Sequence, residues 1–258
     1  MLVVAAVAAA GLLATASSAS AALTALTVGG TASYEANGAG VLVPVTVTCA
    51  RGAQIEFGYL SLTQRLPNSS LVNHANGQAA SPPCSGSPQR IYAVFSSDTG
   101  APLHVGSAVV QVEVYTCSPT SCFDDHQSLS RVVQVAKVDF PSESMHAPRL
   151  DVTLSTSATI VAAGAGMRVS GTVRCTSSSR GDVSAIAWQL SVDGVQAGGT
   201  GQLSVACDGQ YHPVSLVVAA GSRVWHKGQA LVALTLGVCF PASGICGVVI
   251  GVDTVTVS

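Results

Sequence analysis

The spacing of the cysteines constrains this chain more than any other feature of its sequence. Eight cysteines fall into two groups of four, with successive gaps of 35, 33 and 5 residues in the first group and 32, 32 and 7 in the second. The groups are Cys49, Cys84, Cys117 and Cys122, and then Cys175, Cys207, Cys239 and Cys246. A spacing that recurs in this way indicates that one disulfide-stapled unit is encoded twice.

The sequence around the cysteines repeats as well. The segments that end at the first cysteine match between the copies, as do the tripeptides that begin at the second cysteine and the triplets eleven residues before the third. They are VTVTC at 45–49 and GTVRC at 171–175, CSG at 84–86 and CDG at 207–209, and GSA at 106–108 and GQA at 228–230. These shared landmarks support an internal duplication.

Apolar and polar residues alternate inside each copy, which is typical of strands with one buried face. In the first copy Val110, Val112 and Val114 share one face of a predicted strand. Turn-forming pairs such as Asp193-Gly194 separate the apolar stretches. The second copy reads as seven strands, at 152–160, 167–175, 186–192, 201–207, 214–218, 230–239 and 247–257.

Seven short strands in about 110 residues favour an immunoglobulin-like sandwich. We therefore predict an all-β fold of two tandem seven-stranded immunoglobulin-like sandwiches. Trp188 stands 13 residues after Cys175, where such domains place a core tryptophan on the third strand. We expect Trp188 in the core of the second domain. The first copy has Leu62 at the comparable position, so the tryptophan is not essential to the pattern.

The amino terminus has the features of an export signal. An apolar run at 2–16 precedes Ala19-Ser20-Ala21, which fits an A-x-A cleavage site, although no Lys or Arg precedes the run. A weak signal and a longer one that begins upstream both fit. We predict a signal peptide at 1–21 and a secreted, extracellular protein, with domain 1 at 22–138, a linker at 139–148 and domain 2 at 149–258.

Composition excludes several classes of protein. Charged residues make up 9% of the chain, against about 25% in an average globular domain, and hydrophobic residues make up 48%. Such a chain has enough apolar side chains for a core and is not intrinsically disordered. With a net charge of −2 and two lysines, Lys137 and Lys227, it has no basic surface for nucleic acid or anionic lipid.

One apolar segment is long enough to span a bilayer. Residues 230–252 carry no charge, which leaves a tail anchor as a second interpretation. Pro241 interrupts the segment, and its counterpart in the first copy carries Glu113, Asp124 and Arg131. We therefore favour a buried β-hairpin and expect no stable membrane insertion.

The cysteine pairing follows from hairpin geometry. The third and fourth cysteines of each copy flank a short turn, and neighbouring antiparallel strands bring such residues within disulfide range. We predict the bonds Cys117–Cys122 and Cys239–Cys246, and by elimination Cys49–Cys84 and Cys175–Cys207. Zinc sites usually have short C-x₂₋₄-C knuckles in duplicate, whereas C-x₄-C and C-x₆-C occur here once per copy, and the C-x-x-C redox motif is absent.

The sequence offers little for catalysis. None of the six histidines lies in a recognised metal motif, and there is no G-x-S-x-G elbow. The run Asp124-Asp125-His126 has ligand-type side chains, but the second copy has Gly247-Val248-Val249 in its place. We expect no catalytic residues, no metal and no cofactor, and predict that the protein is not an enzyme.

The tips of the cysteine-closed hairpins are the candidate binding surface. Phe240, Pro241 and Ile245 lie within or beside the second hairpin turn, and Phe123 lies just beyond the first. A disulfide that holds such a loop rigid reduces the entropy lost on binding. The alternative is that these side chains fold back over their own hairpin.

These motifs carry two resemblances. The V-x-C, C-x-G and C-x₄₋₆-C landmarks, between about Thr27 and Val257, resemble secreted immunoglobulin-like repeat proteins of actinobacteria that have no assigned activity. The hairpin 117–122 is also similar to one in the neocarzinostatin family, which implies an enediyne chromophore beside that loop. The other disulfide of that family closes a short loop, whereas the predicted one here spans 35 or 32 residues.

Three functions follow as hypotheses. The first is a non-enzymatic extracellular interaction or adhesion module. The second is a carrier of an apolar small molecule at the hairpin tips, and the third is a secreted hydrolase. The partner expected from the sequence is accordingly an extracellular protein, a glycan or an apolar small molecule.

Overall fold

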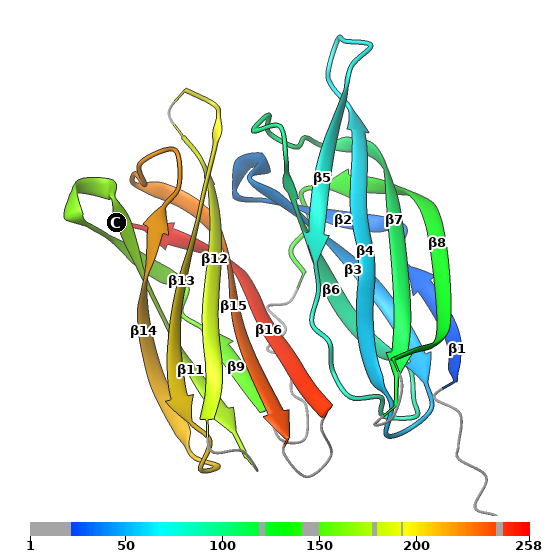
Figure 1. The fold of residues 1–258 in the computed structure, drawn as a ribbon. Helices are drawn as coiled ribbons and strands as arrows, with labels where there is room; N and C mark the ends of the chain where they lie inside the picture. The colour runs from blue at the N-terminus through cyan, green and yellow to red at the C-terminus, as the bar shows by residue number, and fades with distance from the viewer. Residues whose placement is uncertain (1–21, 119–121, 141–149, 177–179, 192, 241–244) are drawn as a thin grey trace, which may run out of the picture.

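A computed structural model describes residues 22–118, 122–140, 150–176, 180–191, 193–240 and 245–258. Two all-β domains lie side by side with their strands along a common long direction (Figure 1). Domain 1 holds β1 (Leu23–Val28), β2 (Thr31–Glu35), β3 (Gly40–Cys49), β4 (Gln54–Arg65), β5 (Val72–Gln78), β6 (Gln89–Ser97), β7 (Gly106–Cys117) and β8 (Cys122–Ala136). Domain 2 holds β9 (Leu150–Leu154), β10 (Ser157–Val161), β11 (Gly166–Cys175), β12 (Arg180–Leu190), β13 (Gln196–Ala206), β14 (Tyr211–Ala220), β15 (Gly228–Phe240) and β16 (Ile245–Val257).

The two domains share one strand arrangement, as the duplication predicts. Domain 1 has the order β1-β3-β2-β8-β7-β4-β5-β6 and domain 2 the order β10-β16-β15-β12-β13-β14-β11-β9. The pairings β3–β6 and β10–β11 close each set of strands into a barrel-like sandwich. The predicted all-β fold of two tandem immunoglobulin-like domains is confirmed.

Within the described residues, each domain has eight strands rather than seven. The strand predicted at 152–160 is broken at Ser155-Thr156 into β9 and β10. β9 pairs with one end of β11, whereas β10 pairs with the other end of β11 and, in parallel, with Thr256 and Val257 of β16. One straight strand cannot follow both neighbours, so the chain bends between them.

The inward faces of the strands form the cores. Val110, Val112 and Val114 of β7 are at most 1% exposed, and the next residues along the strand point outward, as the alternation predicts. Burying a side chain of this size contributes about 1.5–3 kcal/mol. The uncharged segment 230–252 belongs largely to β15 and β16, which pair as an antiparallel hairpin. Among the described residues, no helix is long and apolar enough to cross a membrane.

A short turn precedes the third strand of both domains. The 3₁₀ turn η1 (Ala36–Gly38) lies between β2 and β3, and η2 (Ala162–Gly164) lies between β10 and β11. All three residues of each turn have positive φ angles. The carbonyl of Gly38 accepts a hydrogen bond from the backbone N–H of Leu103 at 3.0 Å, and the carbonyl of Gly164 accepts one from Trp225 at 2.9 Å.

Candidate functional site

Two disulfides join distant parts of the chain. Cys49 is bonded to Cys84 with a Cα–Cα distance of 5.6 Å, and Cys175 is bonded to Cys207 at 4.7 Å. These are the two long-range pairings that the sequence predicts. In domain 1 the disulfide ties the loop after β5 to the end of β3, and the backbone N–H of Cys84 donates to the carbonyl of Ala53, just before β4, at 2.7 Å.

The hairpin cysteines face each other in the strand ladders. Cys117 lies opposite Cys122 between β7 and β8, and Cys239 lies opposite Cys246 between β15 and β16. Cys117 is disulfide-bonded. The side chains of the other three lie outside the described residues, so the two hairpin bonds stay predictions.

The candidate binding residues at the hairpin tips cannot be placed. Pro241 and the side chains of Phe123, Phe240 and Ile245 lie outside the described residues. The proposed small-molecule site at these tips therefore gains no support. Within the described part of the chain, no cluster of three or more His, Cys, Asp or Glu residues could hold a metal ion.

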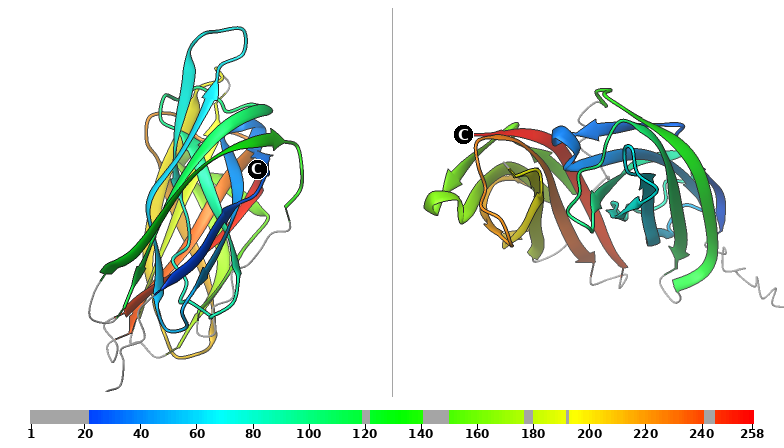
Figure 2. Two further views of the ribbon diagram at one scale, coloured as in Figure 1. Left: turned by 90° about the vertical axis from the view of Figure 1, so that its right-hand side faces the viewer. Right: turned by 90° about the horizontal axis from the view of Figure 1, so that it is seen from above.

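The two domains pack on each other through unlike faces. Domain 2 presents the outer face of β12, β15 and β16, and domain 1 presents the outer face of β3 and β6 together with η1. The view from above in Figure 2 shows β16 beside the turn between β2 and β3. The interface is therefore heterologous, because each domain contributes a different surface.

An apolar layer forms the centre of the interface. Trp188, Leu231 and Ile250 of domain 2 are at least 91% buried and belong to the same apolar cluster as Leu42 and Val94 of domain 1. The expectation that Trp188 lies in the core of domain 2 is wrong. Trp188 points outward from its own domain, and domain 1 covers it.

Hydrogen bonds surround this layer. The side-chain Nε2 of Gln196 donates to the carbonyl of Ala39 at 2.7 Å, and its backbone N–H donates to the carbonyl of Gly100 at 2.9 Å. Ser81 and Val248 exchange two backbone hydrogen bonds of 3.1 and 3.3 Å. Since domains joined by small polar contacts move relative to one another, this combination of apolar packing and backbone pairing favours one fixed arrangement.

The matching face of domain 1 is built from different residues. The ladders align the two domains pair by pair, because the repeated glycines Gly106 and Gly228 begin β7 and β15 in the same register. The outward pairs Trp188–Leu231, Ile186–Ala233 and Thr235–Ile250 of domain 2 correspond to Thr63–Val109, Ser61–Gln111 and Glu113–Ser128 of domain 1. We call the outer face of β4, β7 and β8 the open face of domain 1.

The outer face of β3 and β6 in domain 1 also differs in polarity from the matching face of β11 and β14 in domain 2. In domain 1 the pairs Leu42–Val94 and Pro44–Tyr92 lie on the outer face of β3 and β6, and three of these four side chains are at least 91% buried. Domain 2 has Arg168–Val217 and Ser170–Ser215 at the matching positions. Each domain is thus apolar where it meets the other and more polar on the corresponding free face, as terminal units of a repeat array are.

A polar cavity of about 310 Å³ opens where the domains meet. Its lining includes Tyr34, Glu35 and Lys137 from domain 1 and Gln229 and Thr254 from domain 2. Glu35 accepts a hydrogen bond from the Thr254 hydroxyl at 2.6 Å, and the Lys137 ammonium lies 5.8 Å from the centre of the Tyr34 ring.

A carboxyl lies beside that bonded pair. Burial raises the pKa of the Asp253 carboxyl. The backbone N–H of Thr254 opposes this rise, and the charge of Glu35 adds to it.

The open face of domain 1 combines rings and polar groups. The ring of Tyr115 stacks with that of His126 at a centroid distance of 5.8 Å, and its hydroxyl donates to Glu113 at 2.5 Å. This hydrogen bond, followed by burial, raises the pKa of the Tyr115 phenol. Gly58 makes room for the Tyr115 ring, since a Cβ there would lie 2.1 Å from a ring carbon.

A buried amide fixes the start of β7 and of β15. In domain 1 the Gln64 side chain accepts from the backbone N–H of His104 at 3.0 Å and donates to the His104 carbonyl at 2.6 Å. Gln189 makes the same two bonds to His226, at 3.0 and 2.9 Å. A repeated motif in the sequence marks this shared contact, because His-x-Gly occurs at 104–106 and again at 226–228. The two histidine rings make matching contacts as well, with the carbonyl of Arg65 at 2.7 Å and with that of Leu190 at 2.6 Å.

No protein-family model matches this chain, and no curated protein does. Among solved structures, it is similar to the YadV chaperone with 14% identity and a TM-score of 0.24, over 89% of this chain and 99% of that one. It is also similar to the BSP domain of a biofilm-associated protein, with 10% identity and a TM-score of 0.23, over 93% of this chain and 52% of that one.

A third similarity, to E. coli alpha-2-macroglobulin, has 12% identity and a TM-score of 0.26, over 92% of this chain and 16% of that one. At these TM-scores the similarities assign neither a family nor an activity. Because no family model matches the chain, the resemblances to actinobacterial repeat proteins and to the neocarzinostatin family are not supported by a family assignment.

Proposed function

We propose that this chain is a secreted, non-enzymatic interaction or adhesion module that binds a partner through the open face of domain 1. One observation carries the proposal. The face of domain 2 that corresponds to this surface is covered by a neighbouring domain, whereas in domain 1 the same face is exposed and has a different set of side chains.

The open face has the composition of a non-obligate protein interface. Tyr59, Val109 and Val132 are 51%, 42% and 65% exposed, and the two valines lie directly opposite each other between β7 and β8. Around them lie hydroxyl and amide groups such as those of Ser61 and Gln111, which hydrogen-bond each other at 3.2 Å. Protein contact surfaces are rich in tyrosine and poor in lysine, so we propose an extracellular protein as the partner.

Domain 2 supports this surface. The apolar layer around Trp188 and Leu231 and the bonds of Gln196 hold domain 1 by its opposite side. A surface held in one orientation loses little conformational entropy when it binds. The two disulfides add chain cross-links that suit an oxidising compartment.

The test is a binding assay with the oxidised chain on immobilised matrix proteins and glycans. Val132→Glu should weaken binding to a protein target at least tenfold. Val224→Glu is the matched control, because Val224 is 62% exposed but belongs to domain 2, and it should bind as the parent does.

Equal binding by Val132→Glu and the parent would remove the open face from the proposal. Binding confined to glycans would keep the surface and change the partner. Hydrolysis of a panel member by the parent would refute the non-enzymatic role.

A further inference from the structure

One strand edge of domain 2 has free backbone groups. β13 pairs with β12 along its whole length, from Leu190 opposite Gln196 to Arg180 opposite Ala206. On its other side it pairs with β14 at Gly199 and Thr200, and the backbone of Val217 lies close against Gly201. Within the described residues no strand pairs with that side at 202–206. The N–H and C=O groups on that side form an open edge.

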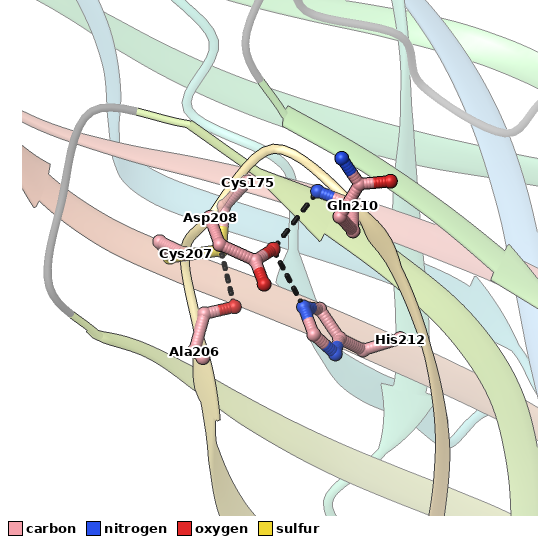
Figure 3. A network of polar contacts seen from close by, with 6 residues as sticks. All are labelled: Cys175, Ala206, Cys207, Asp208, Gln210 and His212. Carbon is pink, nitrogen blue, oxygen red and sulfur yellow. Dashed lines mark hydrogen bonds and ion pairs between the residues drawn. A yellow bond between two sulfur atoms is a disulfide. The ribbon is translucent and has the colours of Figure 1, made fainter.

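The turn after β13 keeps this end of the strand apart from β14. Cys207 is tied to Cys175 of β11, and Asp208 accepts hydrogen bonds from the backbone N–H of Gln210 at 2.9 Å and from the His212 ring at 2.8 Å (Figure 3). The disulfide holds the turn on β11, and the two hydrogen bonds fix the shape of the turn. β14 therefore does not pair with this end of β13.

Natural proteins usually protect such an edge with charged residues or proline. β13 has neither between Gln196 and Ala206. The corresponding edge of domain 1 is protected, because β5 ends at Gln78 and Pro82 and Pro83 follow. There the carbonyl of Pro82 accepts a hydrogen bond from Ile55 of β4 at 3.2 Å, which folds the segment onto its own domain.

The side chains of the edge alternate in a way that fits another strand. Leu203 and Val205 pack against the core of domain 2 but are only half-buried. Ser204 lies on the other face, is exposed, and donates to Asp182 of β12 at 3.1 Å. A strand added to this edge would cover Leu203 and Val205 and satisfy the free backbone groups.

We propose that a second copy of this chain occupies the edge, with β13 of each copy paired antiparallel about a two-fold axis at Ser204. This register sets Leu203 opposite Val205 of the second copy and Ser204 opposite Ser204, so apolar meets apolar and polar meets polar. The strand is uncharged, so its self-pairing meets no repulsion between strand residues, and a two-fold contact closes after two copies.

The experiment measures the mass of the full oxidised chain by sedimentation equilibrium over a wide concentration range. A monomer–dimer equilibrium is expected. Ser204→Asp places two new carboxylates across the axis, beside the two Asp182 side chains, and should raise the dimer dissociation constant at least tenfold. Ser215→Asp, an exposed serine on β14, is the matched control and should leave it unchanged.

A second variant tests the register. Ser204→Cys sets two thiols opposite each other across the axis, within disulfide range, and mild oxidation should give a covalent dimer linked at position 204. Unfolding of Ser204→Asp by circular dichroism should match the parent, which separates lost pairing from lost folding. A parent chain that is monomeric at every concentration, or a dimer that Ser204→Asp leaves intact, would overturn the proposal.

Discussion

The side chain of Leu231 in domain 2 packs on the backbone of Gly40 in domain 1. A Cβ atom at position 40 would lie 2.2 Å from Leu231 Cδ2, well inside van der Waals contact. The two residues come from different copies of the repeat and are 191 positions apart. Domain docking therefore depends on a missing side chain at one position and a large one at the other.

The first prediction tests that pair with a double-mutant cycle. Gly40→Ala should cost about 1–3 kcal/mol because the new methyl overpacks the interface, and Leu231→Ala should cost about 2–5 kcal/mol because it leaves a cavity. In the double variant the smaller residue makes room for the methyl, so the total should fall short of the sum by about 0.5–3 kcal/mol. Urea unfolding measures all four chains, and additive losses would contradict the contact.

The second prediction separates the two tryptophans. Trp188→Thr takes the residue found at the matching position of domain 1, so both domains should stay folded while the interface weakens. Unfolding should then split into two transitions, and the emission maximum of the remaining Trp225, which is 2% exposed, should stay blue-shifted. A red shift would instead mean that Trp188 supports the core of its own domain. Tyr59→Thr, at an exposed ring, is the control.

The third prediction concerns pH. Folding raises the pKa of the Asp253 carboxyl above its ordinary value of 3.8. The protonated carboxyl therefore stabilises the folded state at pH values below 3.8, and this contribution is lost as the pH rises through the raised pKa. Asp253→Asn should therefore raise Tm by about 1–3 °C at pH 7, and the difference should disappear near pH 3. Thermal scans across this range decide it, and a constant difference would contradict the assignment.

The fourth prediction concerns the buried amides. Gln189→Leu leaves the N–H and C=O of His226 without their side-chain partner and should cost about 1–3 kcal/mol in domain 2. Gln64→Leu should cost as much in domain 1. Gln78→Leu, at an exposed position of β5, is the control. If either buried substitution were neutral by urea unfolding, the amide would not hold the start of its strand.

The cysteine spacing and the alternation of apolar residues were enough to predict two β-domains of one design and the two long disulfides. Both features depend on residues that are close in the chain or on a spacing that occurs twice, so the sequence alone is enough to predict them. The break at Ser155-Thr156 was not predicted, because a strand that changes neighbours keeps the same apolar alternation on both sides of the bend.

Leu62 and Trp188 show what the sequence alone does not predict, namely which face of a strand is buried in its own domain. Both stand 13 residues after the first cysteine of their copy, yet Leu62 points into its core and Trp188 points out of its own. The cause is a bulge at Gly58 in β4, which adds one residue and so reverses the face of everything after it.

By itself the sequence determined the strand pattern, the duplication and the long cross-links, because each depends on residues close in the chain or on a repeated spacing. Only the tertiary structure decided which apolar faces became cores and which became the interface between the domains. A row of apolar residues on a strand has the same sequence pattern whether it packs in the core of its own domain or against the other domain. Which of the two occurs depends on the register of the strand and on the surface that covers it.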